Sequence, residues 1–151
     1  MKKELKVGAI REGTVIDHIP TNSTFAVADI LDLKNYDNIV SIATNLPSKR
    51  TGKKGIVKVG GKFLTKDEVN KIALVAPKAT VNIIKDYEVK QKIKVNVPEF
   101  IEKIIKCSNP NCVTNMEKEI MTKFYVLSKE PIKVRCYYCE RRMSSEDIEL
   151  K

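Results

Sequence analysis

The sequence predicts an α+β protein: a ferredoxin-like N-terminal antiparallel sheet with two helices, plus a small all-β zinc domain. The first observation is the order strand, helix, strand, strand, helix, strand, which is the split βαβ order of ferredoxin-like sheets. The second is Pro98, which is typical of a linker. The third is that all four cysteines lie after it. We therefore expect two domains, residues 1–97 and 98–151.

The first elements follow from apolar periodicity. Residues 5–19 alternate as a strand with a bulge or bend at 11–13, and Pro20 ends it. Asn22 or Ser23 can cap a helix that has one apolar face. Residues 39–44 then predict a strand that is buried on most of both faces.

A basic loop over residues 46–55 and a third strand over 56–59 are expected next. Thr65 and Glu68 form a capping box at the start of a second helix, and Pro77 ends that helix. Residues 79–97 predict two further strands around a turn at 85–86. Beyond Pro98, short strands are expected at 124–127, 132–136 and 143–150.

The cysteines are arranged as Cys-x4-Cys, an interval of 23 residues, and Cys-x2-Cys: Cys107, Cys112, Cys136 and Cys139. Two closely spaced pairs suit the tetrahedral thiolate site that Zn²⁺ prefers, with Zn–S distances of about 2.3 Å. Two disulfides or an iron site are alternatives, but no secretion signal precedes the cysteines and paired motifs in a cytoplasmic chain favour metal. Four thiolates leave no open position, so we expect one structural zinc per chain. This domain also needs such a staple, because it is too small to build a large core.

The formal charge of +9 is unevenly distributed. Residues 1–99 hold 18 Lys/Arg against 11 Asp/Glu, whereas residues 100–151 hold 10 against 8. The N-terminal domain is therefore expected to attract a phosphorylated ligand, a nucleic acid or an acidic partner. No apolar run approaches the ~20 residues of a membrane span, and the N-terminus has no apolar signal region, so we expect a cytoplasmic protein.

Catalytic signatures are weak. His18 follows Asp17 and could form a catalytic pair, but a polar residue at a strand end is the preferred interpretation, because no nucleophile motif accompanies it. No phosphate-binding loop is present either, so an enzyme in its own right is not expected. Lys58 and Lys92 lie on apolar strands, where their stems can pack and their ammonium groups can reach a phosphate, and Tyr87 offers a ring for a base.

Two function classes remain at this point. One is a nucleotide-sensing module that docks on another protein, and the other is a basic zinc-ribbon nucleic-acid-binding protein. Aromatic residues make up only 6% of the chain and are scattered along it, which weakens the second.

Three stretches and the cysteine spacing together resemble the regulatory chain of aspartate carbamoyltransferase. They are Gly13-Thr14-Val15-Ile16-Asp17-His18-Ile19-Pro20, Asn45-Leu46-Pro47-Ser48, and Ala76-Pro77-Lys78-Ala79-Thr80-Val81-Asn82 with Tyr87-Glu88-Val89. The match covers almost the whole chain in order, and the ordered set is more specific than any one stretch. Two positions depart from the family pattern: Gly8, where well-known members carry an acidic residue, and the apolar Ile83.

The resemblance implies a non-catalytic regulatory subunit of pyrimidine biosynthesis with an N-terminal allosteric domain that binds ATP and CTP. It also implies a regulatory homodimer and an assembly of two catalytic trimers with three regulatory dimers, in which the zinc domain docks on the catalytic chain, with no nucleic acid or membrane partner. Carried over by position, the nucleotide site would comprise Ala9, Ile10, Val15, Asp17, His18, Lys58, Asn82, Ile84, Tyr87, Val89 and Lys92.

Overall fold

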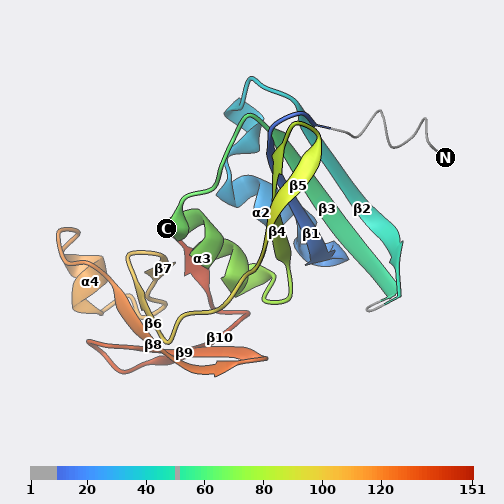
Figure 1. The fold of residues 1–151 in the computed structure, drawn as a ribbon. Coiled ribbons are helices and arrows are strands. Elements are labelled where there is room, and N and C mark those ends of the chain that lie inside the picture. The colour runs from blue at the N-terminus through green and yellow to red at the C-terminus, as the bar shows by residue number, and fades with distance from the viewer. Residues whose placement is uncertain (1–9, 50–51) are drawn as a thin grey trace. The chain divides into compact units, whose positions relative to one another are not determined.

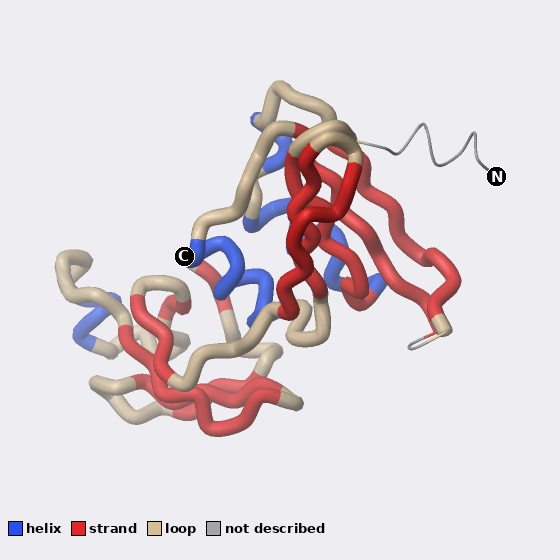
Figure 2. The backbone as a smooth tube through the Cα atoms, viewed as in Figure 1, coloured by secondary structure: helices blue, strands red, loops and turns tan. Residues whose placement is uncertain are grey.

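The computed structural model describes residues 10–49 and 52–151 (Figure 1). The chain divides into two compact units, Met1–Asn96 and Val97–Lys151. Figure 2 shows strands as the main element of both units, with the longer helices in the first. This mixture of antiparallel sheets and few helices confirms the predicted α+β class.

The first unit contains a five-stranded antiparallel sheet in the order β2-β3-β1-β4-β5. The first four strands in this order have the arrangement of a ferredoxin-like sheet, and β5 extends it as a hairpin partner of β4. The elements are β1 Gly13–Pro20, η1 Thr21–Ser23, α2 Thr24–Ile30, η2 Leu33–Asn35, β2 Val40–Ser48, β3 Gly52–Gly60, α3 Lys66–Val75, β4 Thr80–Lys85 and β5 Glu88–Lys94.

The core of this unit lies between the sheet and its two helices, which cover one face of it (Figure 1). Ile16 and Val57 from the sheet and Val27 and Ile72 from the helices are completely buried. Gly55 permits the close approach of α2, because a Cβ there would overlap the side chain of Thr24. The opposite face of the sheet is not covered by these helices.

The ends of the two helices are stabilised differently. The predicted capping box of α3 is confirmed: the Glu68 amide donates to Thr65 Oγ1 at 3.2 Å, and the Thr65 amide donates to Glu68 Oε1 at 2.9 Å. The predicted cap of α2 is wrong in detail, because the Ser23 side chain makes no capping hydrogen bond. Instead the buried Thr24 hydroxyl donates to the Thr21 carbonyl at 3.0 Å.

One predicted feature of the sheet is confirmed and two differ in the structure. β1 begins at Gly13, directly after the predicted bend, which the structure has at Arg11 and Glu12. A further register shift lies between Ile16 and Ile19, and the predicted residues 5–9 lie outside the described residues. β2 is an edge strand with no residue in the buried class, because it pairs only with β3. The predicted basic loop is largely strand, since β2 runs to Ser48 and β3 begins at Gly52.

The second unit contains a four-stranded sheet in the order β10-β9-β8-β6 and a two-stranded sheet of β11 and β7. Its core includes Phe124, Ile101, Val134 and Met143, all at most 2% exposed. The predicted strand at 132–136 is confirmed, whereas the predicted strand at 143–150 divides into two strands of different sheets. The elements are β6 Phe100–Glu102, β7 Ile105–Lys106, α4 Val113–Met116, β8 Lys123–Lys129, β9 Ile132–Cys136, β10 Arg142–Ser144 and β11 Glu149–Leu150.

No helix among the described residues is long and apolar enough to cross a membrane.

Candidate metal centre and nucleotide-binding face

Four short segments of the second unit bring the cysteines together. Cys107 directly follows β7, Cys112 precedes α4, Cys136 ends β9 and Cys139 lies in the turn before β10. Their sulfur atoms all lie within 4.8 Å of one another. The sulfurs of Cys107 and Cys139 are 3.6 Å apart and those of Cys112 and Cys136 are 3.8 Å apart.

These separations match a tetrahedral metal site. Four sulfurs about 2.3 Å from a central ion lie about 3.8 Å from one another. A disulfide needs sulfurs about 2.05 Å apart, and all four cysteines are free, so the disulfide alternative is wrong. The predicted one-metal site is confirmed as a cluster suited to hold a single ion.

Hydrogen bonds from neighbouring residues fix the two cysteine turns. The Asn115 amide group donates to the carbonyl oxygens of Cys107 at 2.9 Å and Asn109 at 2.7 Å, which ties α4 to the first turn. In the second turn, the Glu140 amide donates to the Cys136 carbonyl, and Glu140 has φ of 63°, a left-handed conformation. The sequence reasoning did not single out Asn115, although an asparagine three residues after a metal-ligand cysteine was visible.

The cluster is costly to maintain as thiolates without a cation. Burial raises the pKa of the Cys107 thiol and, likewise, the pKa of the Cys136 thiol. Burial also acts to raise the pKa of Cys139, but hydrogen bonds from the Arg141 amide and the Asn109 side chain outweigh it and lower that pKa to about 7. A bound divalent ion would stabilise all four as thiolates, and this soft donor set suits zinc.

In the first unit, the strand register aligns four of the predicted nucleotide-binding residues. Val15 of β1 pairs with Lys58 of β3 on one side and with Asn82 of β4 on the other, and Asn82 pairs in turn with Lys92 of β5. Residues directly opposite one another in an antiparallel sheet point to the same face. Lys58, Val15, Asn82 and Lys92 therefore form one row across four strands, on the face that the helices leave open. We call this the lysine row.

Other predicted residues lie beside this row. Ile84 pairs with Val89 across a bulge in β5, which keeps both on the face of Asn82. Ile83 points the opposite way and pairs with Thr14, so its departure from the family pattern lies on the helix face. Gly8 and Ala9 lie outside the described residues.

Asp17 and His18 do not form a catalytic pair. The Asp17 carboxylate contacts Lys54 Nζ at 2.9 Å and accepts the His18 backbone N–H at 2.6 Å, while His18 Nδ1 lies 3.0 Å from the Thr80 hydroxyl. Although burial acts to raise the pKa of Asp17, the hydrogen bond from Lys54 and the His18 amide lower it below its ordinary value. Asp17 is thus held as a carboxylate, and its partner Lys54 lies within the stretch that the sequence predicted as a basic loop.

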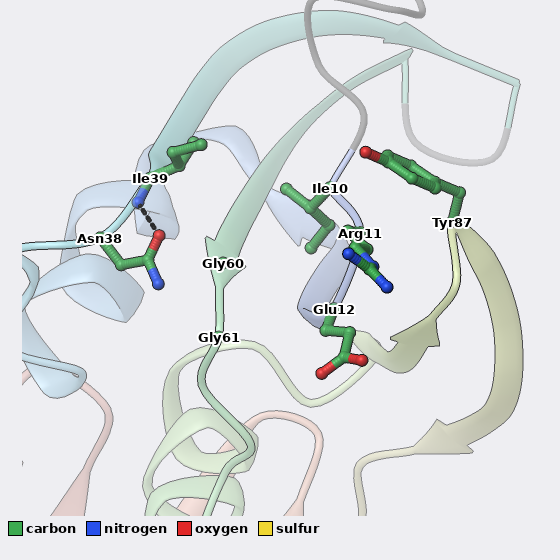
Figure 3. A pocket seen from close by; sticks show the side chains of 8 residues that line it. All are labelled: Ile10, Arg11, Glu12, Asn38, Ile39, Gly60, Gly61 and Tyr87. Carbon is green, nitrogen blue, oxygen red and sulfur yellow. Dashed lines mark hydrogen bonds between the residues drawn. The ribbon is translucent and has the colours of Figure 1, made fainter.

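A cavity of about 560 Å³ lies at one end of this sheet (Figure 3). Among the predicted nucleotide-binding residues that the structure describes, Ile10 and Tyr87 line it, whereas Lys58 and Lys92 are not part of its wall. Figure 3 shows Tyr87 beside Arg11 and Glu12, with Asn38 and Ile39 across the Gly60–Gly61 backbone. The Tyr87 amide donates to the Arg11 carbonyl at 3.0 Å, which attaches the β4–β5 turn to the start of β1.

These features define a two-unit protein with a polar, cationic sheet face in one unit and a closed cysteine metal centre in the other. Residues 5–96 match the family model described as the aspartate carbamoyltransferase regulatory chain, allosteric domain. Residues 99–149 match the metal-binding domain of the same regulatory chain. The chain belongs to the aspartate carbamoyltransferase regulatory chain family.

Relatives of known name agree over nearly the whole length. The aspartate carbamoyltransferase regulatory chain of Pyrococcus horikoshii is 62% identical over 147 residues, which cover 96% of this chain and 96% of the relative. That of Pyrococcus furiosus is 60% identical with the same coverage. That of Parabacteroides distasonis is 44% identical over 150 residues, covering 99% of this chain and 97% of the relative.

Proposed function

We propose that this chain is a non-catalytic cytoplasmic subunit that binds nucleotide effectors such as ATP and CTP on the lysine row and carries their effect to a catalytic trimer. Pyrimidine biosynthesis is the pathway that the family name implies. The observation that carries the proposal is the register that aligns Lys58, Val15, Asn82 and Lys92.

The row has the dimensions of a nucleotide. Three strand spacings separate the backbones of Lys58 and Lys92, a span of about 14 Å. Two ammonium groups at its ends can bind phosphate oxygens, and the half-buried Val15 between them offers an apolar floor. Asn82 donates to the Val15 carbonyl at 3.3 Å, which holds its amide group in place within the row.

The ends of the ligand would meet different chemistry. Asp17, held as a carboxylate by Lys54, can accept hydrogen bonds from ribose hydroxyl groups. The cavity beside Ile10 and Tyr87 supplies apolar surface and backbone groups for a base. An anion arriving near Lys54 would compete with Asp17 for its ammonium group, so this ion pair would be sensitive to occupancy.

The metal centre would have a structural role. A closed tetrathiolate site offers no position for substrate, and zinc binding can contribute about 10 kcal/mol or more to the folding of such a unit. A rigid metal unit would present a docking surface at a low entropic cost. Exposed apolar side chains, including Val113, Met116 and Tyr137, are available for such contacts, whereas Met143 is buried.

The β2 edge would form the regulatory homodimer. β2 carries no charged residue. Ile39, directly before the strand, is 65% exposed, and Ile42, within the strand, is 38% exposed. The other edge, β5, carries Lys90, Lys92 and Lys94, which discourage strand pairing. An uncharged open edge favours pairing with a second copy of the same strand.

Calorimetry and co-purification test the proposal together. The purified full chain should bind ATP and CTP, and it should form a stable complex with separately produced catalytic trimers. Adding a nucleotide should then change the activity of the complex and leave that of free trimers unchanged. A chain that binds neither nucleotide nor catalytic trimer would contradict the proposal.

A further inference from the structure

The outer face of the four-stranded sheet in the metal unit gathers residues that lie far apart in the sequence. Phe100 of β6 pairs with Tyr125 of β8, Tyr125 pairs with Arg135 of β9, and Arg135 pairs with Arg142 of β10. The adjacent residues Ile101, Phe124, Val134 and Met143 are buried on the core side. The paired residues therefore form one row on the opposite, outer face.

Aromatic rings on this face pack against one another. The ring centroids of Phe100 and Tyr125 are 5.2 Å apart, and the Tyr137 ring lies 5.9 Å from Tyr125 and 6.4 Å from Phe100. The side chains nevertheless remain exposed: Phe100 and Tyr125 by 38% each, and Tyr137 by 48%. Such a cluster retains apolar area that a partner can cover.

Two cations rest on these rings. The Arg135 guanidinium lies 5.3 Å from the Tyr125 ring centroid, and Lys123 Nζ lies 5.3 Å from that of Tyr137. Both distances are within the range of cation–π attraction. Arg135 Nε is buried and has no hydrogen-bond partner within the part of the chain that the structure describes. The Arg135 guanidinium thus lies against the Tyr125 ring, with its Nε still able to donate.

The charge on this face is strongly biased, although the unit as a whole is nearly neutral. The register directs four basic side chains to this outer face: Lys123, Lys133, Arg135 and Arg142. From the same strands, one acidic side chain, that of Glu102, points to the outer face. A hollow of about 400 Å³ adjoins Tyr125 and is lined also by Leu127, Lys129 and Glu99. The face therefore combines positive charge, exposed rings and a depression beside them.

These observations favour a protein partner over a nucleic acid. A base needs an open ring face on which to stack, and here Arg135 and Lys123 already lie over Tyr125 and Tyr137. A carboxylate approaching from outside can pair with either cation without displacing it from its ring. Aromatic and Arg side chains at the centre of a patch are also the usual anchors of protein interfaces.

We propose that this aromatic–cationic face, formed by Phe100, Lys123, Tyr125, Lys133, Arg135, Tyr137 and Arg142, docks on an acidic and partly apolar patch of the catalytic chain. The inference rests on the proposed function and specifies which surface of the metal unit makes the contact. The face would supply cations for carboxylates of the catalytic chain, and the ring cluster would bury its remaining exposed area against apolar side chains.

Binding of the full-length chain to separately produced catalytic trimers tests this surface. Arg135→Glu should weaken binding about tenfold or more, because it removes a preorganised cation and places a negative charge opposite the proposed carboxylates of the catalytic chain. Arg142→Glu, at an exposed position of the same row, and Tyr137→Ser should each weaken it as well. Lys118→Glu, an exposed lysine in a loop outside the sheet, is the matched control and should bind like wild type. Unchanged metal content and melting temperature would show that each variant is folded.

The outcomes separate this inference from the proposed function. A wild-type chain that does not bind the trimers contradicts the proposed function itself. A wild-type chain that binds, with Arg142→Glu and Tyr137→Ser variants that are folded and bind equally well, overturns the docking face alone. Loss of binding to a uridine oligonucleotide in the same variants, with trimer binding intact, would assign the face to single-stranded nucleic acid and also overturn it.

Discussion

Removing the Lys58 ammonium group should weaken nucleotide binding substantially. Lys58 is half-buried at one end of the lysine row, directly opposite Val15 of the neighbouring strand. A hydrogen bond between a cation and a phosphate oxygen is worth about 1.5–3 kcal/mol. Lys58→Ala should therefore raise the dissociation constants of ATP and CTP about 10- to 150-fold.

Calorimetric titration at fixed ionic strength measures this effect, because salt screens part of the attraction. Lys90→Ala is the control, since Lys90 is an exposed lysine at the bulge of β5 and pairs with Glu88 at 3.1 Å. That variant loses the same charge from the same unit and should change affinity less than about twofold. Metal content and melting temperature should stay near the wild-type values in both variants.

The double variant Lys58→Ala/Lys92→Ala tells whether the two lysines act on one phosphate group or on two. Independent contacts should give additive losses of binding free energy, whereas a shared phosphate group should give a smaller combined loss. Equal and small effects of Lys58→Ala and Lys90→Ala would refute the reasoning, because affinity would then follow the net charge of the unit and not the lysine row.

Three further predictions concern the metal centre, the Asp17 ion pair and the β2 edge. Cys136→Ser should abolish stoichiometric zinc binding, which elemental analysis measures, and should unfold Val97–Lys151. Hydrogen exchange should then show loss of amide protection in this unit while Met1–Asn96 stays protected. Zinc retained at one per chain would contradict this prediction. Asp17→Asn should destabilise the chain by up to about 1 kcal/mol at pH 7. Because the pKa of Asp17 is lowered in the folded chain, the difference in unfolding free energy between wild type and variant should be complete above pH about 4 and should vanish as pH falls through the lowered pKa. Denaturant titrations at several pH values measure this difference. A difference that persists at pH about 2 would exclude ionisation of Asp17 as its source. Ile42→Lys should convert a dimer to a monomer in analytical ultracentrifugation, whereas Gln91→Lys on the β5 edge should not, and a dimer that survives Ile42→Lys would exclude the β2 edge.

Local signals in the sequence predicted the α+β class and several elements well. The capping box at Thr65 and Glu68 depends on residues three apart, so no tertiary information was needed to place the start of α3. The turn predicted at 85–86 lies one residue further on, where Asp86 and Tyr87 adopt left-handed conformations between β4 and β5. The burial of β2 could not be read locally, because an edge strand differs from a central one only in the number of its neighbours.

The candidate sites divide in the same way. Cysteine spacing was sufficient for the metal centre, since two tight turns aim the sulfurs wherever the strands between them run. The basic stretch at 46–55 is predicted as a loop, yet its first three residues pair with β3 as the end of β2, and residues 52–55 pair with β1 and β2 as the start of β3. This pairing is what places Lys54 next to Asp17, 37 residues away in the sequence.

Average composition also concealed the charge pattern of the metal unit. Its ten basic and eight acidic residues over 100–151 suggest a nearly neutral surface, but strand register directs four basic residues and one acidic residue to a single face. Aromatic residues that look scattered in the sequence meet on that face, because β6, β8 and β9 are adjacent. Contact patches of this kind arise from pairing and cannot be counted from composition.

A nucleotide bound to the first unit can alter a partner bound to the second only if the two bound states of the chain differ in affinity for both ligands. The connection between the units is short: the Val95 amide is bonded to Ala79 in the first, and the Glu99 carbonyl to Val126 in the second. Only residues 96–98 lie between these anchors, so in the proposed function a shift of β5 on phosphate binding would be passed to β6 along this short connection. By linkage, docking on the catalytic chain must change nucleotide affinity by the same factor that the nucleotide changes docking. The lysine row and the aromatic–cationic face are therefore coupled in the proposed function: a variant that weakens nucleotide binding should change trimer binding measured at a subsaturating nucleotide concentration, and the reverse should hold for a variant of the docking face.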